Sequence, residues 1–451
     1  MSDRPIAAII LAAGKGTRMK SRLHKVLHPV GGRPMLRHLI EELRHANLHR
    51  TVVVVGAEAE SVRGEMEADD IHFAHQHEQL GTGHAALQAE EALAGFSGDV
   101  LVCFGDVPLL KASTVRNMQA RLNADDAPAS VVLGFRPDDP KAYGRVIADD
   151  AGRIRKMVEY KDATEDERLC DLCNAGPLMA RVEDLFELLK KISNDNAQGE
   201  YYLPDVVTVA EKDGRTSAVV EADEAEVSGV NDRADLAAAE ALWQDEQRTH
   251  FMREGVTLRA PETVFFSWDT EIANDVIVEP NVVFGAGVKV GEGAHIHAFS
   301  HLEGADVGPN CSVGPYARLR PGAVMEEGAK VGNFVEMKKA VLGRGAKASH
   351  LTYLGDASVG AEANIGAGTI TCNYDGYFKY RTEIGAGAFI GSNSALVAPV
   401  RIGAGAIVGA GSVVTKDVEA DGLRLERSQQ ETKAGWAKRF RERMQAKKDK
   451  S

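Results

Sequence analysis

A glycine-containing segment near the N-terminus has the residue types of a phosphate-binding loop. The apolar run Ile6–Leu11 is followed by Ala12-Ala13-Gly14-Lys15-Gly16-Thr17-Arg18-Met19. Glycines let backbone N–H groups approach phosphate oxygens closely, and Lys15 and Arg18 add positive charge. The segment has neither the Walker A spacing nor the third glycine of the dinucleotide fingerprint, so it indicates a different class of phosphate site.

Two further segments offer oxygen ligands for a cation. Asp106 follows the apolar run Val100–Phe104, and Asn231 ends Gly229-Val230-Asn231. One carboxylate, one amide oxygen and the oxygens of a triphosphate suit Mg²⁺, which prefers hard oxygen donors and keeps several waters. We therefore predict Asp106 and Asn231 as magnesium ligands, although an aspartate in such a turn is also a common helix cap.

Polar side chains also stand out in the glycine-rich last third of the chain. Arg320 and Lys338 can bind a phosphate, and His350 can accept a proton from an attacking amine near neutral pH. A single histidine in such a segment can equally be structural. The aromatic and polar insert Cys372–Arg381 is typical of a binding loop, although a tolerated surface loop has the same composition.

The elements that must position the N-terminal residues alternate between strand and helix. Such alternation predicts an α/β doubly wound domain with a parallel sheet, and ligands then bind where the strands end. The expected strands are Ile6–Leu11, Thr51–Val55, Val100–Phe104 and Ser130–Phe135, and the expected helices include Pro34–Ala46 and Gly83–Ala94.

A six-residue period dominates the chain after about residue 256. An aliphatic residue recurs every sixth position and glycine commonly follows it, as in Val331-Gly332 and Ile402-Gly403. This period predicts a parallel β-helix with one inward aliphatic residue on each short face. The predicted inward residues are Ile272, Val278, Phe284, Val290, Ile296, Leu302, Val313, Leu319, Met325, Val331, Met337, Ile384, Ile390, Leu396, Ile402, Val408 and Val414.

Three regions follow from these patterns. We predict an α/β domain over residues 1–233, a linker helix over 234–255 and a β-helix domain over 256–451 with a basic tail. Asn231 or Asp232 can cap the linker helix, and Gly255 can end it. The tail after Arg427 is either a solvated amphipathic helix or a basic arm that holds a phosphorylated ligand.

The N-terminal motifs resemble those of a known family. Leu11–Met19, followed by Lys25-Val26-Leu27-His28, is similar to the sugar-nucleotide pyrophosphorylases, which have a Rossmann-like fold. The resemblance implies uridylyl transfer from UTP to a sugar 1-phosphate with Mg²⁺, with Lys25 and Arg18 neutralising charge as catalytic residues. The implied contacts to nucleotide and sugar are Leu11, Ala12, Ala13, Gly14, Lys25, Gln76, Gly81, Thr82, Phe104, Gly105, Gly144, Glu159, Asn174 and Asn231.

The six-residue repeats resemble the left-handed β-helix acyltransferases, which work as homotrimers. The strings Lys347–Asp356 and Asn364–Gly376 are similar to a bacterial family of bifunctional N-acetylglucosamine-1-phosphate uridylyltransferases / glucosamine-1-phosphate acetyltransferases. The resemblance implies synthesis of UDP-N-acetylglucosamine for cell-wall and lipopolysaccharide precursors, with His350 as general base. It implies that Arg320, Lys338, Tyr353 and Asn364 hold glucosamine 1-phosphate and that Ala367, Asn373, Tyr374, Ser392, Ala410 and Arg427 line the acetyl-CoA site.

Composition restricts the alternatives. A formal net charge of −13 makes nonspecific nucleic-acid binding a poor expectation, and five cysteines in 451 residues suit a reducing compartment. No apolar run approaches the roughly 18 residues that span a bilayer, so we expect a cytoplasmic protein without a membrane partner. Two alternatives stay open: a uridylyltransferase whose β-helix is only a trimerisation scaffold, and a non-catalytic assembly subunit with the same two-domain plan.

Overall fold

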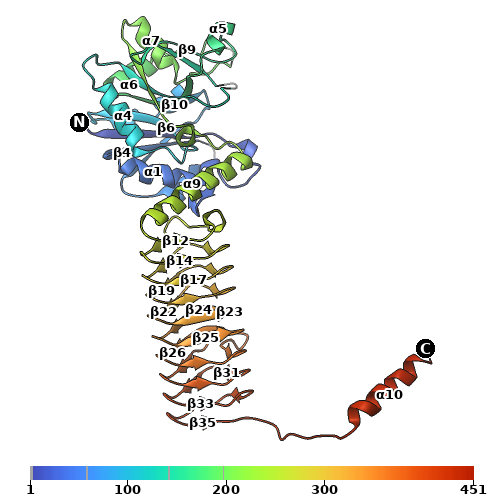
Figure 1. Cartoon of the computed structure of the whole chain (residues 1–451). Helices are drawn as coiled ribbons and strands as arrows, with labels where there is room; N and C mark the ends of the chain where they lie inside the picture. Colours follow the sequence, from blue (N-terminus) through green and yellow to red (C-terminus); the bar gives the residue numbers. More distant parts are fainter. Residues whose placement is uncertain (1–3, 57–58, 141–142, 197, 451) are drawn as a thin grey trace. The chain divides into compact units, whose positions relative to one another are not determined.

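The computed structural model describes residues 4–56, 59–140, 143–196 and 198–450 (Figure 1). The chain forms two compact units, residues 1–247 and 248–451. The boundary between them falls inside helix α9 (Arg233–Arg253), which coincides with the expected linker helix.

A mixed β-sheet forms the centre of the first unit. Its strand order is β5-β4-β1-β6-β10-β7-β11-β9-β8. Strands β5, β4, β1 and β6 run parallel to one another, so their carboxyl ends share one edge. The strands are β1 (Ile6–Ala12), β4 (Leu48–Val55), β5 (Ile71–His75), β6 (Asp99–Phe104), β7 (Ser130–Phe135), β8 (Arg145–Ala148), β9 (Arg153–Val158), β10 (Cys173–Arg181) and β11 (Ser217–Glu221).

Helices cover both faces of this sheet, which confirms the doubly wound architecture. In β1, Ile6, Ala8 and Ile10 pack on one face, while Ala7 and Ile9 pack on the other. The first face carries α1 (Met35–Arg44), α2 (Ala59–Met66) and α4 (Ala112–Leu122), and the second carries α3 (Thr82–Leu87), α6 (Val182–Leu189) and α7 (Asp205–Lys212). Because both faces are covered, the strands read as continuous apolar runs.

Strand β10 departs from the expected parallel sheet, because it runs antiparallel to both β6 and β7. After β7 the chain forms the antiparallel hairpin β8–β9 and only the short helix α5 (Glu165–Arg168). This hairpin takes the place of the long crossover helix that usually returns a chain parallel to its starting strand. The expectation of a parallel sheet was therefore wrong for β10 and also for β8 and β9, which pair antiparallel with each other.

The second unit is a parallel β-helix whose coils stack one on another (Figure 1). Equivalent strands of successive coils pair in parallel, for example β14-β17-β20-β23. The strands are β12 (Thr257–Leu258), β13 (Glu271–Ile272), β14 (Ile277–Val278), β15 (Val283–Phe284), β16 (Lys289–Val290), β17 (His295–Ile296), β18 (His301–Leu302), β19 (Ala305–Val307), β20 (Ser312–Val313), β21 (Arg318–Leu319), β22 (Ala323–Met325), β23 (Lys330–Asn333), β24 (Glu336–Leu342), β25 (Lys347–His350), β26 (Tyr353–Val359), β27 (Asn364–Ile365), β28 (Ile370–Cys372), β29 (Thr382–Ile384), β30 (Phe389–Ile390), β31 (Ala395–Val397), β32 (Val400–Ile402), β33 (Ile407–Val408), β34 (Val413–Val414) and β35 (Leu423–Arg424).

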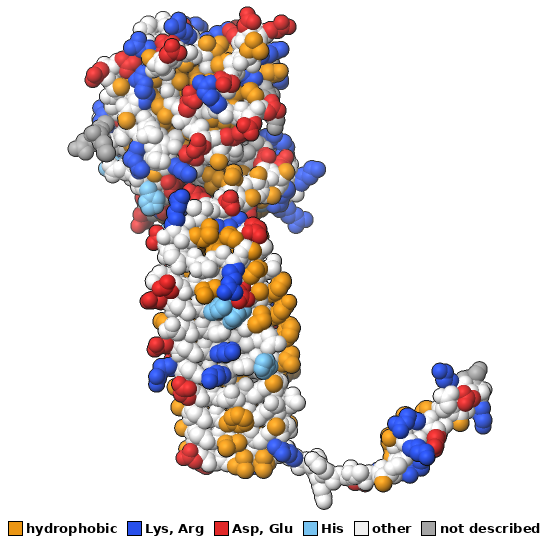
Figure 2. Space-filling model, in the orientation of Figure 1, with side chains coloured by type: hydrophobic (Ala, Val, Ile, Leu, Met, Phe, Trp, Pro, Cys, Tyr) orange, Lys and Arg blue, Asp and Glu red, His pale blue; other side chains and the backbone are white. Residues whose placement is uncertain are grey.

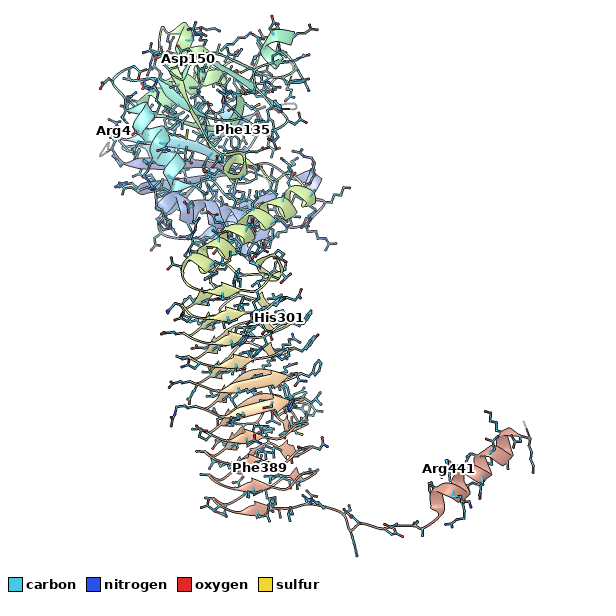
Figure 3. The ribbon with its side chains drawn as sticks, in the orientation of Figure 1. Arg4, Phe135, Asp150, His301, Phe389 and Arg441 are labelled. Carbon is cyan, nitrogen blue, oxygen red and sulfur yellow. The ribbon has the colours of Figure 1, made fainter. Side chains whose placement is uncertain are left out.

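The predicted inward residues form the core of this β-helix. Every one of them from Val278 onward is buried, while Ile272, in the first complete coil, is only half-buried. The residue directly before an inward one can face outward, as His301 and Phe389 do (Figure 3). Helix α10 (Trp436–Lys448) follows β35, and its side chains are exposed. Among the described residues, no helix is both long and apolar enough to cross a membrane.

The glycine that follows many inward residues has a steric cause. A Cβ placed on Gly343 would lie 2.7 Å from the Val359 carbonyl oxygen of the next coil, and one on Gly366 would lie 2.5 Å from the Ile390 carbonyl oxygen. Real Cβ atoms do not approach backbone this closely, so any larger residue would push two coils apart. Close stacking of coils therefore selects glycine at these positions.

We expect Gly343→Ala to lower the free energy of unfolding of the β-helix by about 1–3 kcal/mol, as overpacking does. Gly387→Ala is the control, because a Cβ there meets nothing within 4 Å and faces only the strain of φ +65°, about 1 kcal/mol. Thermal unfolding of both variants measures the difference. An equal loss of stability in the two variants would contradict the steric explanation.

Candidate functional site

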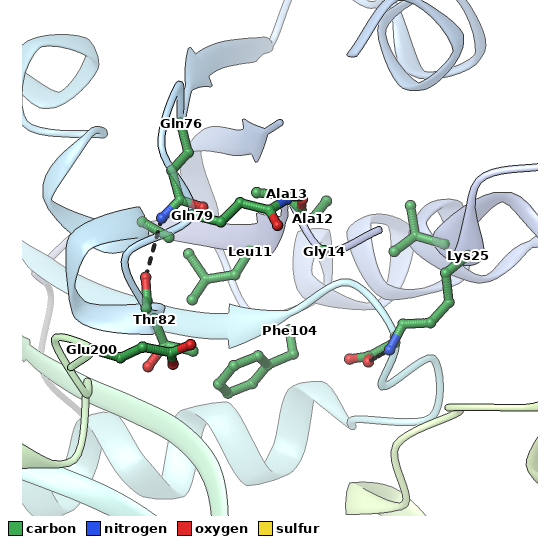
Figure 4. Close-up of a pocket in the computed structure, with 14 residues that line it drawn as sticks. Leu11, Ala12, Ala13, Gly14, Lys25, Gln76, Gln79, Thr82, Phe104 and Glu200 are labelled. Carbon is green, nitrogen blue, oxygen red and sulfur yellow. Dashed lines mark hydrogen bonds and ion pairs between the residues drawn. The ribbon is translucent and has the colours of Figure 1, made fainter. Parts of the chain in front are cut away.

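A pocket of about 250 Å³ opens where the parallel strands of the first unit end (Figure 4). Most of the predicted nucleotide contacts line it: Leu11, Ala12, Ala13, Gly14, Lys25, Gln76, Gly81, Thr82 and Phe104, together with Asp106. Leu11 and Ala12 end β1 and Phe104 ends β6, so the sheet edge itself is one wall. The structure thus brings together residues from four separate segments.

One end of this pocket carries amide groups. Gln76 donates from Nε2 to the Gly81 carbonyl oxygen at 3.1 Å, and Gln79 donates to the Ala13 carbonyl oxygen at 2.7 Å. Thr82 accepts from the Leu203 backbone N–H at 2.9 Å, which fixes the start of α3. Gln79 was not among the predicted contacts, although it lies between Gln76 and Gly81 in the sequence.

The other end of the pocket is charged, with Phe104 between the two ends in Figure 4. Lys25 forms an ion pair with Asp106, and Arg18 donates to the Asn231 side-chain oxygen at 2.8 Å. The Val230 N–H donates to the Asp106 carbonyl oxygen at 2.9 Å, which joins the two loops. Both predicted magnesium ligands therefore direct oxygen atoms at cationic groups, and this donor set fits a hard divalent cation.

Three predicted contacts lie in a separate pocket of about 40 Å³. Gly144, Glu159 and Asn174 line it together with Tyr202 and Asp205. Partial burial, with the negative charges of Asp162 and Asp205, raises the pKa of Glu159, and burial also raises the pKa of Asp205. The polar lining and the two carboxyl groups suit a ligand that offers hydroxyl donors.

Three other predicted residues line neither pocket. Gly105 lies in the turn after β6, where its N–H donates to the Leu11 carbonyl oxygen at 3.0 Å. Arg18 donates to the Asn231 side-chain oxygen beside the Lys25–Asp106 pair. The predicted uridylyl set is therefore divided among two pockets and this charged edge.

In the β-helix, His350 belongs to a column of outward residues on successive coils. Backbone hydrogen bonds link the coils along it: Leu351 N–H to Asn333, Gly368 N–H to His350, Asn393 N–H to Ala367 and Gly411 N–H to Ser392, at 2.7–3.3 Å. The β27–β30 and β30–β33 registers continue the column to Ser392 and Ala410. Thus the predicted residues Ala367, Ser392 and Ala410 follow His350 along one line.

Asn333 fixes the orientation of the His350 ring. The side-chain oxygen of Asn333 lies 2.7 Å from His350 Nδ1. An amide oxygen can only accept, so Nδ1 carries the proton and Nε2 is left as the basic nitrogen. Asn333 was not predicted, because the six-residue period does not reveal the register that places Asn333 beside His350.

A cluster of cations lies on the neighbouring strands. Arg320 follows β21 and pairs with Glu336 at 2.7 Å, and in the β21–β24 register it lies beside Lys338. The positive charges of Arg320 and Lys379 lower the pKa of Lys338. Cations that repel one another in this way are typical of a site that binds an anion. Lys379, in the predicted binding loop, is a further residue that the sequence reasoning missed.

The remaining predicted residues belong to the same coils as the His350 column and the Arg320–Lys338 cations, or to coils and loops next to them. Tyr353 is in register with Glu336, and Asn364 lies on β27 in register with Lys347. Asn373 donates to the Asp356 carboxylate at 2.6 Å, and Tyr374 donates to the Gly376 carbonyl oxygen at 2.5 Å inside the loop. Arg427 donates to the Ala410 carbonyl oxygen at 3.0 Å, at the end of the His350 column.

Comparisons with known proteins agree with both units. Residues 8–171 match the MobA-like NTP transferase domain, and residues 269–304 and 381–416 match the bacterial transferase hexapeptide repeats. The chain is 61% identical over 446 residues to the bifunctional protein GlmU of Sphingopyxis alaskensis, covering 99% of this chain and 98% of that protein. Proteins of the same name from Rhizorhabdus wittichii (62% over 448 residues; 99% of both chains) and Zymomonas mobilis (55% over 448 residues; 99% of this chain, 100% of that one) are also similar.

The raised pKa of Glu159 predicts a stability effect of definite sign. A carboxyl pKa that is higher in the folded than in the unfolded protein gives stability at low pH that is lost as pH rises through the folded pKa. Glu159→Gln removes this loss, so we expect its Tm to exceed that of the parent at pH 7.5. The difference should vanish by about pH 4, where both side chains are neutral.

Asp149→Asn is the control of opposite sign. The N–H groups of Arg153 and Ala151 lower the pKa of Asp149, so its contribution is present at neutral pH and lost on acidification. This variant should unfold at a lower Tm at pH 7.5. Calorimetry from pH 4 to pH 7.5 measures both, and a Glu159→Gln protein less stable than its parent at pH 7.5 would contradict the assignment.

Proposed function

This chain belongs to the family of bifunctional GlmU proteins, and we propose that it makes UDP-N-acetylglucosamine in two successive reactions. In the first, acetyl-CoA acetylates glucosamine 1-phosphate. In the second, UTP uridylylates the product and pyrophosphate leaves. One observation carries the proposal: each unit has its own set of converging polar groups, the pocket beside Lys25 in the first and the His350 column in the second.

In the uridylyl reaction, a phosphate oxygen of the sugar attacks the α-phosphorus of UTP and the bond to the β-phosphate breaks. The pocket's amide end would hold the uracil ring through Gln76 and Gln79, and Gly14 would let the backbone approach the phosphates. Glu159 and Asn174 would receive the sugar in the adjoining pocket. The chemistry needs alignment and charge neutralisation, which Lys25 and Arg18 can provide.

Asp106 and Asn231 would hold Mg²⁺ in this reaction. Their oxygens face Lys25 and Arg18, so both already accept positively charged partners. When bound, Mg²⁺ supplies positive charge to the triphosphate. With Asp106 engaged by the metal, Lys25 would exchange its carboxylate partner for a phosphate oxygen.

In the acetyl reaction, the amine of glucosamine 1-phosphate attacks the thioester carbonyl, the C–S bond breaks and the thiol of coenzyme A leaves. His350 Nε2 would accept the proton that the amine loses, because Asn333 keeps the other ring nitrogen protonated. The proton then goes to the departing sulfur. Ala367, Ser392 and Ala410 would leave room for the pantetheine chain along the column, which ends at Arg427.

Arg320, Lys338 and Lys379 would bind the phosphate of glucosamine 1-phosphate. Their mutual repulsion, seen in the lowered pKa of Lys338, is relieved when an anion enters. Tyr353, one coil from Glu336, would contact the same sugar. Asn364 would contribute from β27.

A ladder of exposed apolar residues supports assembly into a homotrimer. Phe299, Tyr316, Phe334 and Leu351 occupy equivalent corners of successive coils, each 47–61% exposed. The rings of Phe299, Tyr316 and Phe334 stack on one another, with successive centroids 4.9 Å and 5.3 Å apart. Figure 2 shows hydrophobic side chains gathered along one edge of the β-helix. Each residue also has a positive φ, a strained conformation for a side chain of this size.

The ladder borders the acetyl site, because Phe334 follows Asn333 and Leu351 follows His350. A continuous apolar surface of this kind indicates a protein interface. Copies of this chain that docked on the ladder would therefore lie beside His350 and could contribute to the same acetyl site.

We expect His350→Ala to lower acetyl transfer by about 10²- to 10⁴-fold, the usual contribution of a general base, and to leave uridylyl transfer intact. Release of free thiol from acetyl-CoA and of pyrophosphate from UTP measures the two reactions. His301→Ala, another exposed histidine of the β-helix, is the matched control and should affect neither. Full acetyl transfer by His350→Ala would exclude His350 as the general base, whereas no release of free thiol by the unmodified chain would leave the β-helix as a trimerisation scaffold.

Asp106→Ala should give the reverse pattern. Loss of the carboxylate should lower uridylyl transfer at least about 100-fold, because the chain then holds less well the Mg²⁺ that would neutralise charge on the triphosphate. Acetyl transfer should stay at the parental rate. Failure of the unmodified chain to release pyrophosphate from UTP with Mg²⁺ would favour a non-catalytic assembly subunit.

Tyr316→Asp tests the ladder. A charge at its centre should disrupt the trimer, so light scattering should report a smaller mass and acetyl transfer should fall while uridylyl transfer persists. Leu169→Asp is the control, since Leu169 is 83% exposed in the first unit and lies outside the ladder. A Tyr316→Asp protein that still forms the trimer would show that the ladder is not part of the interface.

A further inference from the structure

Two histidines and a glutamate converge on the outer surface of the β-helix, outside the residues proposed for acetyl transfer. His295 and His297 flank Ile296 of β17, which is fully buried, so both imidazoles point outward. Glu279 follows β14 on the preceding coil, and the register Val278↔Ile296 brings it beside His297. Figure 2 shows histidine, basic and acidic side chains grouped on the visible face of this unit.

The distances within this cluster are those of a ligand set. Glu279 Oε1 lies 3.0 Å from His295 Nε2 and 3.3 Å from His297 Nδ1, and all three atoms lie within 4.8 Å of one another. A tetrahedral zinc ion bound at 2.0–2.1 Å holds neighbouring ligand atoms about 3.3 Å apart. The side chains therefore need to move little to surround an ion.

Two of the atoms that do not converge have partners of their own. His297 Nε2 lies 3.2 Å from the Ser312 hydroxyl on the next coil, and Glu279 Oε2 accepts from the Ala298 N–H at 3.1 Å. A metal-binding histidine characteristically donates its other ring N–H to an oxygen, which orients the ring and fixes its tautomer. Here Ser312 would orient the ring so that the Nδ1 lone pair faces Glu279.

We propose that Glu279, His295 and His297 bind a divalent transition-metal ion, with Zn²⁺ as the ion that best fits the ligands. Two imidazoles and one carboxylate suit Zn²⁺, whereas Mg²⁺ prefers an all-oxygen set. Water would complete the coordination. The ion would join two successive coils, because Glu279 belongs to one and both histidines to the next.

The charges around the cluster affect its affinity. Arg259, one coil earlier, lies 3.3 Å from Glu279 Oε1, but its side chain is 56% exposed and can turn into solvent when a cation enters. Burial and the neighbouring His297 lower the pKa of His295. The N–H of Ala298 and the two rings outweigh burial and lower the pKa of Glu279.

The test uses the full chain without a histidine tag, stripped with a chelator and held in excess Mg²⁺ so that oxygen-ligand sites are occupied. Co²⁺ is titrated first, because tetrahedral Co²⁺ absorbs visible light far more strongly than the hydrated ion, and Zn²⁺ then displaces it. We expect one ion per chain and a Tm that rises with Zn²⁺ concentration, since only the folded state holds the site.

Variants assign the binding to these side chains. His295→Gln and His297→Gln should each weaken Zn²⁺ binding at least about tenfold, and Ser312→Ala should weaken it about tenfold through the orientation of His297. His301→Gln, on the neighbouring strand β18, is the matched control and should bind as the parent does. Unfolding without metal verifies that each variant is folded.

Two results would overturn the proposal. One is Zn²⁺ binding of parental affinity in the double variant His295→Gln/His297→Gln. The other is a Co²⁺ spectrum of the parent that stays that of the hydrated ion. In either case the three side chains would form only a hydrogen-bonded network across two coils.

Discussion

The hydrogen bonds between successive coils determine where every functional side chain of the β-helix lies. Each coil must approach the next closely enough for backbone N–H and carbonyl groups to meet, which excludes side chains at positions such as Gly343 and Gly366. The same bonds place Asn333, His350 and Ala367 directly in line. Residues that lie one coil apart in the sequence thereby become neighbours, and the proposed acetyl site and the Glu279–His295–His297 cluster both arise this way.

The first unit also brings together polar groups that lie far apart in the sequence, but it does so at the edge of a sheet. Its substrates carry several negative charges, and the sheet edge supplies backbone N–H groups and cationic side chains where the parallel strands end. Lys25 already forms an ion pair with Asp106, and Arg18 already donates a hydrogen bond to Asn231. Ligand binding there would exchange these partners rather than fill a bare positive cavity.

Periodicity made most of the fold predictable. The six-residue repeat identified the β-helix and its inward residues, and the hexapeptide match confirms the architecture. Continuous apolar runs located β1, β4, β6 and β7, because a strand covered on both faces has few polar positions. The orientation of β10 was not predictable in this way, since it depends on a hairpin and a short helix between β7 and β10 rather than on the composition of the strand.

Site prediction from the sequence was less complete, for a physical reason. Glycine loops and strand-end carboxylates are visible as motifs, and the family resemblance, which the full-length relatives confirm, supplied the other residues. Asn333, Lys379 and Gln79 were missed because their positions depend on register and on loop conformation. The division of the uridylyl set into two pockets also required the fold, because Gly144, Glu159 and Asn174 come from three different strands or their ends.

A coil of this β-helix contacts only the coils on either side of it. The chain can therefore gain or lose one whole turn far from His350 without changing any distance within the acetyl site, whereas a partial turn would rotate every later residue onto another face. The number of coils can thus vary in this architecture, whereas the face on which each later residue lies cannot. Related proteins can diverge in the number of coils and still conserve the same chemistry.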